Sequence, residues 1–231
     1  MDRYLREAWT RIVLADDLDA HMAAVGQAQA NAALVETMMT TGTAPERTTV
    51  LFAGAGTGQM FDYVTGSFLA SFLTSYRVTF TDINAAFLDR LRARLAGSSL
   101  NYETVVDDIE DSTLSGPFGM AVVVLVLEHV EWQKALRSLV ALQPEIVHLV
   151  VQRNPPDLGT AITPGRTLPP SIARASEKAH PVLVDPEAIR SFLEGEGYAL
   201  VRRFEQPVPD AKTMIGLTFS AGGLRPPEPS D

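Results

Sequence analysis

Short apolar runs, separated by segments with helical spacing, dominate the middle of the chain. The runs predict strands at 50–53, 76–81, 101–106, 120–127 and 145–151. Apolar residues at helical spacing predict helices over 59–70, 85–95 and 132–142. The run at 120–127 is almost continuously aliphatic, as expected of a central parallel strand that is buried on both faces. Strands and helices that alternate in this way predict a doubly wound α/β sheet.

The last part of the chain predicts one more helix and a pair of strands. Asp185 can cap a helix that begins with Pro186 and an acidic first turn and runs to about residue 194. Residues 198–205 and 212–220 then read as two antiparallel strands. The proline-rich segment 154–170 is expected to be a loop, and long loops at strand ends often carry function.

The N-terminal segment, 1–42, is expected to be helical. Residues 17–39 are rich in good helix formers, and Gly42 ends the run. Residues 21–30 are unusually small and polar for a core helix, so they could pack closely on the domain. They could instead form a lid, with Met22, Gln27 or Gln29 reaching a ligand. The expected division is a helical cap or lid at 1–42, an α/β domain at 43–221 and a disordered tail at 222–231.

Composition narrows the possible classes of function. The chain has 231 residues and no cysteine, which excludes disulfides, zinc–cysteine clusters and a cysteine nucleophile. A formal net charge of −9 opposes binding to nucleic acid. The N-terminus does not look like a signal peptide, and no stretch approaches the roughly 18 apolar residues of a membrane span. We therefore expect a soluble, cytoplasmic protein that binds neither nucleic acid nor a membrane.

The chain is organised around the glycines that follow its first predicted strand. Gly54, Gly56 and Gly58 alternate there, in the pattern G-x-G-x-G. Glycine allows a sharp turn and lets a ligand touch bare backbone. In open α/β sheets, cofactors bind beyond the carboxyl end of such a strand. A dinucleotide fingerprint, G-x-G-x-x-G, would place its third glycine where this chain has Gln59.

Several motifs, taken together, resemble one family. VLFAGAGTG resembles the nucleotide-binding turn of class I S-adenosylmethionine-dependent methyltransferases. TDIN, VVDDIED, FGMAVVVLVLEHV, GYALVRRFEQPV and TMIGLTFSA resemble that family's later motifs in the same order, over about residues 45–221. The resemblance implies a Rossmann-like, seven-stranded sheet, mostly parallel with a C-terminal antiparallel hairpin, plus N-terminal helices. It also implies S-adenosyl-L-methionine as cofactor and S-adenosyl-L-homocysteine as product.

The same resemblance implies a set of cofactor-binding residues. Asp82 would hold the ribose hydroxyls, although it could be an ordinary cap at the strand exit. Asp108 and Ile109 would flank the adenine, although Asp108 could be a solvated loop charge. The full set is Ala53, Gly54, Ala55, Gly56, Gly58, Asp82, Ile83, Asp108, Ile109 and Leu125.

Two positions depart from the family's pattern. Phe52 stands where an acidic residue often helps to orient the methionine portion, so another group must make that contact. Phe118 is followed by Gly119, where the family often has aspartate. Neither departure excludes cofactor binding, because the glycine turn and Asp82 remain.

Candidate residues for the chemistry are fewer. His129 follows a strand end and could be a general base with a pKa near neutrality or a substrate contact; equally, it could point away from the site. His148 is expected to be a hydrogen-bonded core residue. The candidate substrate contacts are Met22, Gln27, Arg153 and Asn154. No constellation of metal ligands is evident, so a cation-dependent mechanism is not expected.

The sequence therefore predicts a methyltransferase that acts on an oxygen or nitrogen atom of a small molecule by in-line displacement. Such catalysis asks the protein mainly for positioning and exclusion of water, since the cofactor carries the activated group. Two alternatives stay open: a protein that keeps the fold without catalysis, motivated by Phe52, and a nicotinamide-dependent oxidoreductase. A homodimer is possible, but the sequence does not specify the oligomeric state, the acceptor or the accepting atom.

Overall fold

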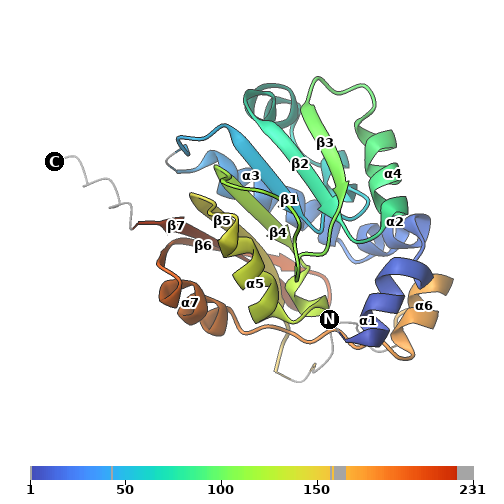
Figure 1. Cartoon of the computed structure of the whole chain (residues 1–231). Helices are drawn as coiled ribbons and strands as arrows, with labels where there is room; N and C mark the ends of the chain where they lie inside the picture. Colours follow the sequence, from blue (N-terminus) through green and yellow to red (C-terminus); the bar gives the residue numbers. More distant parts are fainter. Residues whose placement is uncertain (1, 43, 157, 159–164, 223–231) are drawn as a thin grey trace.

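The structure, a computed structural model, describes residues 2–42, 44–156, 158 and 165–222. Within them lies a seven-stranded sheet of order β3-β2-β1-β4-β5-β7-β6 (Figure 1). Its strands are β1 Thr49–Ala53, β2 Arg77–Asp82, β3 Asn101–Val106, β4 Met120–Val124, β5 Ile146–Arg153, β6 Tyr198–Val208 and β7 Lys212–Ala221. The first five are parallel to one another, and β7 is antiparallel to both β5 and β6. The predicted fold class is confirmed.

Helices cover both faces of the sheet and one of its edges. They are α1 Arg3–Glu7, α2 Ala15–Ala24, α3 Gln27–Thr40, α4 Ala85–Leu95, α5 Trp132–Ala141, α6 Pro170–Ser176 and α7 Pro186–Gly195. The core clusters place α3 and α4 on one face and α5 and α7 on the other. No helix among the residues that the structure describes is long and apolar enough to cross a membrane.

Strand β4 shows how the aliphatic pattern builds the two core layers. Val122 packs in the layer under α3 and α4, whereas Ala121 and Val123 pack under α5 and α7. All three side chains are buried. A strand covered on both faces must be apolar at every position, which is why its sequence does not alternate.

The carboxyl ends of the parallel strands meet at one edge of the sheet. Because β7 is antiparallel to β5, its first residue, Lys212, lies at that same edge. A third core cluster covers the edge with apolar residues of α1, α2 and α6, and Figure 1 shows these helices side by side beyond the strand ends. The N-terminal helices therefore lie where a cofactor crevice is expected.

The segment after the glycine turn differs from its prediction. Instead of one helix over 59–70, it contains a short 3₁₀ turn at Gln59–Asp62 and a π-helical turn at Phe68–Phe72. Thr65 lies between them, and its backbone amide donates to the Glu36 carboxylate of α3 at 3.0 Å. This tertiary hydrogen bond fixes the chain at Thr65 in a conformation that local helical spacing does not reveal.

Two further differences concern helices. The run of helix-forming residues 17–39 is interrupted at Gly26, which caps the start of α3 and has a φ of +71°. A Cβ at Gly26 would lie 3.1 Å from the Pro209 side chain. Helix α6 lies just beyond the predicted loop and carries no strong pattern of its own. The predicted tail falls, after Gly222, outside the described residues, as does much of the predicted loop.

Gly119, just before β4, is packed so closely against the backbone that a substitution there can measure the tightness of this region. A Cβ at this position would lie 2.0 Å from the Arg47 carbonyl oxygen, so the aspartate common in the family does not fit here. We expect Gly119→Ala to lower the free energy of unfolding by roughly 2–3 kcal/mol, because backbone must move to relieve the overlap. Chemical denaturation measures this change. Gly97→Ala is the control, since nothing lies within 4 Å of its Cβ; equal effects of the two variants would contradict the argument.

Candidate active site

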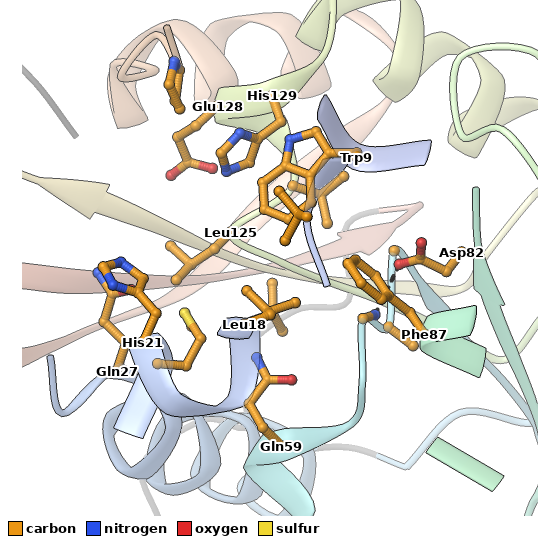
Figure 2. A pocket seen from close by; sticks show the side chains of 18 of the residues that line it. Trp9, Leu18, His21, Gln27, Gln59, Asp82, Phe87, Leu125, Glu128 and His129 are labelled. Carbon is orange, nitrogen blue, oxygen red and sulfur yellow. Dashed lines mark hydrogen bonds between the residues drawn. The ribbon is translucent and has the colours of Figure 1, made fainter. Parts of the chain in front are cut away.

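A cavity of about 240 Å³ opens at the carboxyl edge, between the glycine turn and the N-terminal helices (Figure 2). Apolar side chains from these helices form its cover, among them Trp9, Leu18 and Met22. Polar groups reach it from the ends of β1, β2, β4 and β5 and from the start of β7. Of the predicted site residues, those lining the cavity are Met22, Gln27, Ala53, Gly54, Ala55, Gly56, Asp82, Ile83, Asp108, Ile109, Leu125 and His129.

The glycine turn needs its glycines for different reasons. Gly54 has a φ of +69°, and a Cβ there would lie 2.4 Å from Val126. Gly56, at φ +57°, lines the cavity and presents its backbone to the Asp82 carboxylate. Gly58 also has a positive φ, but it packs toward Leu91 and does not line the cavity. Its role is therefore to close the turn.

Asp82 ends β2 beside the turn and is 8% exposed. Its carboxylate accepts hydrogen bonds from the backbone amides of Gly56 and Asn84, each at 2.9 Å. Burial raises the pKa of Asp82 to about 6, against the lowering effect of these amides. A carboxylate has about four acceptor sites, so Asp82 can cap Asn84 and still accept from vicinal hydroxyls.

Asp108 follows β3 and is tied to the first helix. Its carboxylate lies 2.5 Å from the Arg6 guanidinium of α1 and also accepts from the Glu110 amide. Burial raises the pKa of Asp108, but the hydrogen bonds from Arg6 and Glu110 outweigh burial and hold it below its usual value. The ion pair of Asp108 with Arg6 thus joins α1 to the cavity wall. Ile109, the next residue, also lines the cavity.

The exit of β4 turns sharply into the cavity. Leu125 has a φ of +54°, which costs a non-glycine residue on the order of 1 kcal/mol or more, and its amide is held by the Val150 carbonyl at 2.8 Å. A 3₁₀ turn, Leu127–His129, follows at once. This strained turn places Leu125, Glu128 and His129 around one side of the cavity (Figure 2).

Glu128 was not predicted as a site residue, although it lies in the same motif as His129. Its side chain is 4% exposed and points into the cavity in Figure 2. Its Oε1 accepts from the Gln152 backbone amide at 2.8 Å, whereas its buried Oε2 has no hydrogen-bond partner in the described part of the chain. Burial raises the pKa of Glu128 to about 7.

His129 lies in the cavity wall, where its pKa differs from the expected value near neutrality. Burial lowers its pKa to about 4, because the low-polarity surroundings disfavour the imidazolium. The ring meets Trp9 edge to face, with 4.6 Å between centroids. Its buried Nδ1 has no hydrogen-bond partner among the described residues. His129 is therefore a neutral hydrogen-bonding group near pH 7. His148 is a buried core residue paired with Thr218 at 3.0 Å, as predicted.

The predicted substrate contacts separate into two groups. Gln27 lines the cavity and donates to the Gln152 side chain at 2.6 Å, and Met22 lines it from α2. Gln29 is exposed on α3. Arg153 pairs with Glu205 at 2.8 Å on the surface, and Asn154 donates to the Leu158 carbonyl; neither lines the cavity.

Polar contacts bind the helical cover to the glycine turn. Asp19 of α2 accepts from the Thr57 hydroxyl and pairs with Arg94 of α4 at 2.8 Å. Asp17 accepts from the Ser171 amide of α6 at 2.7 Å. Both carboxylates come from the first turns of α2, so this helix is held above the turn at one end.

Sequence reasoning missed several cavity residues besides Glu128. Asn31 of α3 is 2% exposed, lines the cavity, and has a buried Oδ1 without a hydrogen-bond partner among the described residues. His21, Arg166 and Lys212 line the cavity from three separate elements. No local pattern marks these residues, since only the fold brings them together.

Comparison with known proteins finds a family model that matches part of the chain. Residues 50–143 match the family model described as a methyltransferase domain. Magnesium protoporphyrin IX methyltransferase from Synechocystis PCC 6803, crystallised with S-adenosylhomocysteine, is similar at 15% identity and a TM-score of 0.52, over 90% of this chain and 82% of that one. N-methyltransferase NodS from Bradyrhizobium japonicum WM9 is similar at 14% identity and a TM-score of 0.57, over 85% and 87%.

Glycopeptide N-methyltransferase MtfA is similar at 17% identity and a TM-score of 0.56, over 84% of this chain and 90% of that one. No curated protein matches the chain in sequence. The predicted resemblance is confirmed: the chain has the fold of the class I S-adenosylmethionine-dependent methyltransferases, and residues 50–143 match the model of a methyltransferase domain.

The buried carboxyl of Glu128 predicts a pH-dependent stability. Its pKa is about 7 in the folded protein and near 4.5 when unfolded, so the folded state holds the extra proton between these values. The free energy of unfolding should therefore fall as pH rises from about 4.5 to 7, by up to about 3 kcal/mol. Denaturation at several pH values should show this loss in the wild type and not in Glu128→Gln. The difference between the two free energies of unfolding at each pH isolates it from the pH dependence that other groups cause in both proteins. Glu177→Gln, at an exposed site, is the control; parallel pH profiles for wild type and Glu128→Gln would refute the prediction.

Proposed function

We propose that this protein is an S-adenosylmethionine-dependent methyltransferase that methylates an oxygen or nitrogen atom of a small molecule. One observation carries the proposal: a single apolar cavity joins the glycine turn and Asp82 to the Glu128 carboxyl, whose Oε2 has no partner in the described chain. The similar methyltransferases that were crystallised with S-adenosylhomocysteine support the cofactor.

The residues at the ends of β1, β2 and β3 suit this cofactor. Asp82 would accept hydrogen bonds from the ribose hydroxyls, and Gly56 would let the backbone approach the ligand because it has no side chain. Ile109 offers an apolar surface to the adenine, and Asp108 a hydrogen-bond acceptor beside it. The cavity therefore fits the nucleoside part of the cofactor along the β2 side of the sheet.

The methionine part needs a partner that Phe52 does not provide. Phe52 lines the cavity but packs against Phe61 and Phe80 at centroid distances of 5.7 Å and 5.2 Å. Asn31 lines the same cavity from α3, and its buried Oδ1 is an acceptor that lacks a donor among the described residues. We assign Asn31 as the acceptor for the cofactor's ammonium group.

The bound cofactor supplies a methyl group on a positively charged sulfur, which is already an activated leaving group. Held by the glycine turn and Asp82, the cofactor would give this methyl group to the acceptor's lone pair, and the electrons of the broken carbon–sulfur bond would stay on sulfur. The chain contributes an apolar cover, with Trp9, Leu18 and Met22, that excludes water and holds the acceptor in line.

Glu128 is the group best placed to take the acceptor's proton. It is ionised above a pKa of about 7, and its Oε2 is free to receive a hydrogen bond. His129, which stays neutral, orients the acceptor through its ring nitrogens. A base with a pKa near the working pH is effective in general base catalysis.

Calorimetric titration tests the cofactor. We expect micromolar binding of S-adenosylmethionine and S-adenosylhomocysteine and none of NADH. Asp82→Ala should weaken both by at least about 100-fold, since the ribose loses a charged acceptor. Asn31→Leu should weaken both by about ten-fold, and Gln29→Leu, at an exposed position of α3, should change neither. Binding of NADH alone would favour an oxidoreductase, and binding without turnover of any acceptor would favour a non-catalytic role.

Turnover tests the proton acceptor. With any small hydroxyl or amine acceptor that yields S-adenosylhomocysteine, we expect kcat/KM for S-adenosylmethionine, which reports the cofactor-free enzyme, to rise with pH through about 7 in the wild type, as Glu128 ionises. Glu128→Gln should lower kcat by about 100-fold and abolish this rise. His129→Asn should lower activity and keep the pH profile. A profile unchanged by Glu128→Gln would exclude Glu128 as the base.

A further inference from the structure

Two polar atoms at the exit of β4 lack hydrogen-bond partners. They are Glu128 Oε2 and His129 Nδ1, both buried, and neither has a partner among the residues that the structure describes. Both side chains come from the 3₁₀ turn Leu127–His129 and line the same cavity. Figure 2 shows the carboxyl and the imidazole reaching into the cavity from the same side. Because buried polar atoms in native proteins are nearly always paired, a bound molecule is expected to supply the missing partner.

The surroundings of these two atoms are aromatic and apolar. The Trp9 ring meets the His129 ring edge to face at 4.6 Å and the Phe87 ring in the same manner at 6.3 Å. Trp9 and Phe87 both line the cavity, together with Leu18 and Leu125. An aromatic ligand can add a further offset-stacked or edge-to-face contact to such a group of rings. The molecule that completes the site is therefore expected to be an aromatic ring with few polar groups.

The polar end of this ligand must suit a carboxylate and a neutral imidazole at once. A hydroxyl does so when His129 carries its proton on Nδ1. Its own proton is donated to Glu128, and its oxygen, which has two lone pairs, can accept from His129 and keep a lone pair for the methyl carbon. A neutral amine nitrogen has a single lone pair, which the attack on the methyl carbon uses. An amine therefore cannot accept from His129 and attack at the same time.

The charge and the acidity of the ligand narrow its class further. One positive charge already comes with the sulfonium of the bound cofactor, and an alkylammonium, with a pKa of about 10.4, would add a second to the same apolar cavity. An aliphatic hydroxyl has a pKa near that of water, roughly 16, far above that of Glu128. A phenol, with a pKa of about 10, enters uncharged and lies within about three pKa units of the Glu128 carboxyl, whose pKa is about 7.

We propose that the methyl acceptor is an uncharged phenol, whose hydroxyl lies between the Glu128 carboxylate and the His129 imidazole and whose ring packs against Trp9. This inference rests on the proposed function and deepens it. The phenol's O–H bond breaks and its proton goes to Glu128 Oε2. The oxygen forms the bond to the methyl carbon, and the electrons of the broken carbon–sulfur bond would stay on sulfur. The charges of the carboxylate and the sulfonium are thus both neutralised in the reaction.

The binding test compares phenols with fluoroarenes of nearly the same shape, which cannot donate a hydrogen bond. The probes are phenol, 4-ethylphenol and 2-naphthol, paired with fluorobenzene, 1-ethyl-4-fluorobenzene and 2-fluoronaphthalene. Calorimetry follows their titration into protein saturated with S-adenosylhomocysteine at a pH of about 8, above the Glu128 pKa of about 7. At least one phenol should bind at least about ten-fold more tightly than its fluoroarene, because its hydroxyl donates to a charged acceptor.

Variants assign this preference to the two atoms. Glu128→Leu should remove the preference and leave fluoroarene binding unchanged. His129→Phe keeps an aromatic contact with Trp9 and should weaken phenol binding by about ten-fold, because the hydroxyl loses a donor. Glu177→Leu removes an exposed carboxylate and should change neither.

Turnover with S-adenosylmethionine gives a second readout. The phenol that binds best should yield S-adenosylhomocysteine at least about 100-fold faster than 2-phenylethylamine or 2-phenylethanol, because only the phenol has an acidity close to that of the base. Equal or faster turnover of the amine or of the aliphatic alcohol would contradict the inference.

The outcomes separate this inference from the proposed function. If S-adenosylhomocysteine does not bind, the proposed function fails. If it binds, three binding results overturn the inference alone: phenols and fluoroarenes bind equally, the preference survives Glu128→Leu, or no phenol binds at millimolar concentration. Loss of S-adenosylhomocysteine binding in Glu128→Leu would reveal a damaged fold. Glu128→Gln, which keeps the shape of the side chain, then decides: its neutral acceptor should lower the preference for the phenol, and an unchanged preference would overturn the inference.

Discussion

The reversal of strand order at β1 is the constraint on which the site depends. β1 pairs with β2 on one side and with β4 on the other. After β1 the chain continues to β2, whereas after β4 it continues to β5, so it leaves the two adjacent strands β1 and β4 in opposite directions across the sheet. Such a switch point leaves an open crevice at the carboxyl ends. The turn through Gly54 and Gly56 and the strained turn at Leu125 both end there. Residues from distant parts of the chain, Asp82 and Glu128 among them, therefore share one cavity.

The apolar helices that cover this crevice bury the ionisable side chains beneath them and so shift their pKa values. Burial acts on every ionisable group in the same sense, toward the neutral form: it raises the pKa of Asp82 to about 6 and of Glu128 to about 7, and lowers that of His129 to about 4. A positively charged sulfonium in the same space would reverse the first two effects, since it favours carboxylates. The charge of the cofactor and the ionisation of the site are thus coupled.

Local signals explain what the sequence could predict. The strands and the helices capped by Asn84 and Asp185 follow from apolar spacing and from side chains next to the helix start. The path after the glycine turn could not be predicted, because Thr65 is fixed by a hydrogen bond to a distant helix. The same division applies to the site. The glycine turn and Asp82 lie in recognisable motifs, whereas Asn31 and Lys212 reach the cavity only through the packing of α3 and the antiparallel direction of β7.

The N-terminal helices belong to the site itself. Asp19 accepts a hydrogen bond from the Thr57 hydroxyl in the glycine turn, and Met22, one turn later on the same helix, lines the cavity. Because a short helix moves as a rigid unit, contact at the turn also fixes the position of Met22. The absence of a charge at Phe52 is compatible with this arrangement, since Asn31, the group that we propose in its place, lines the cavity from the next helix. The segment before β1 thus forms both the cover of the cavity, through α2, and part of its polar wall, through Asn31 of α3.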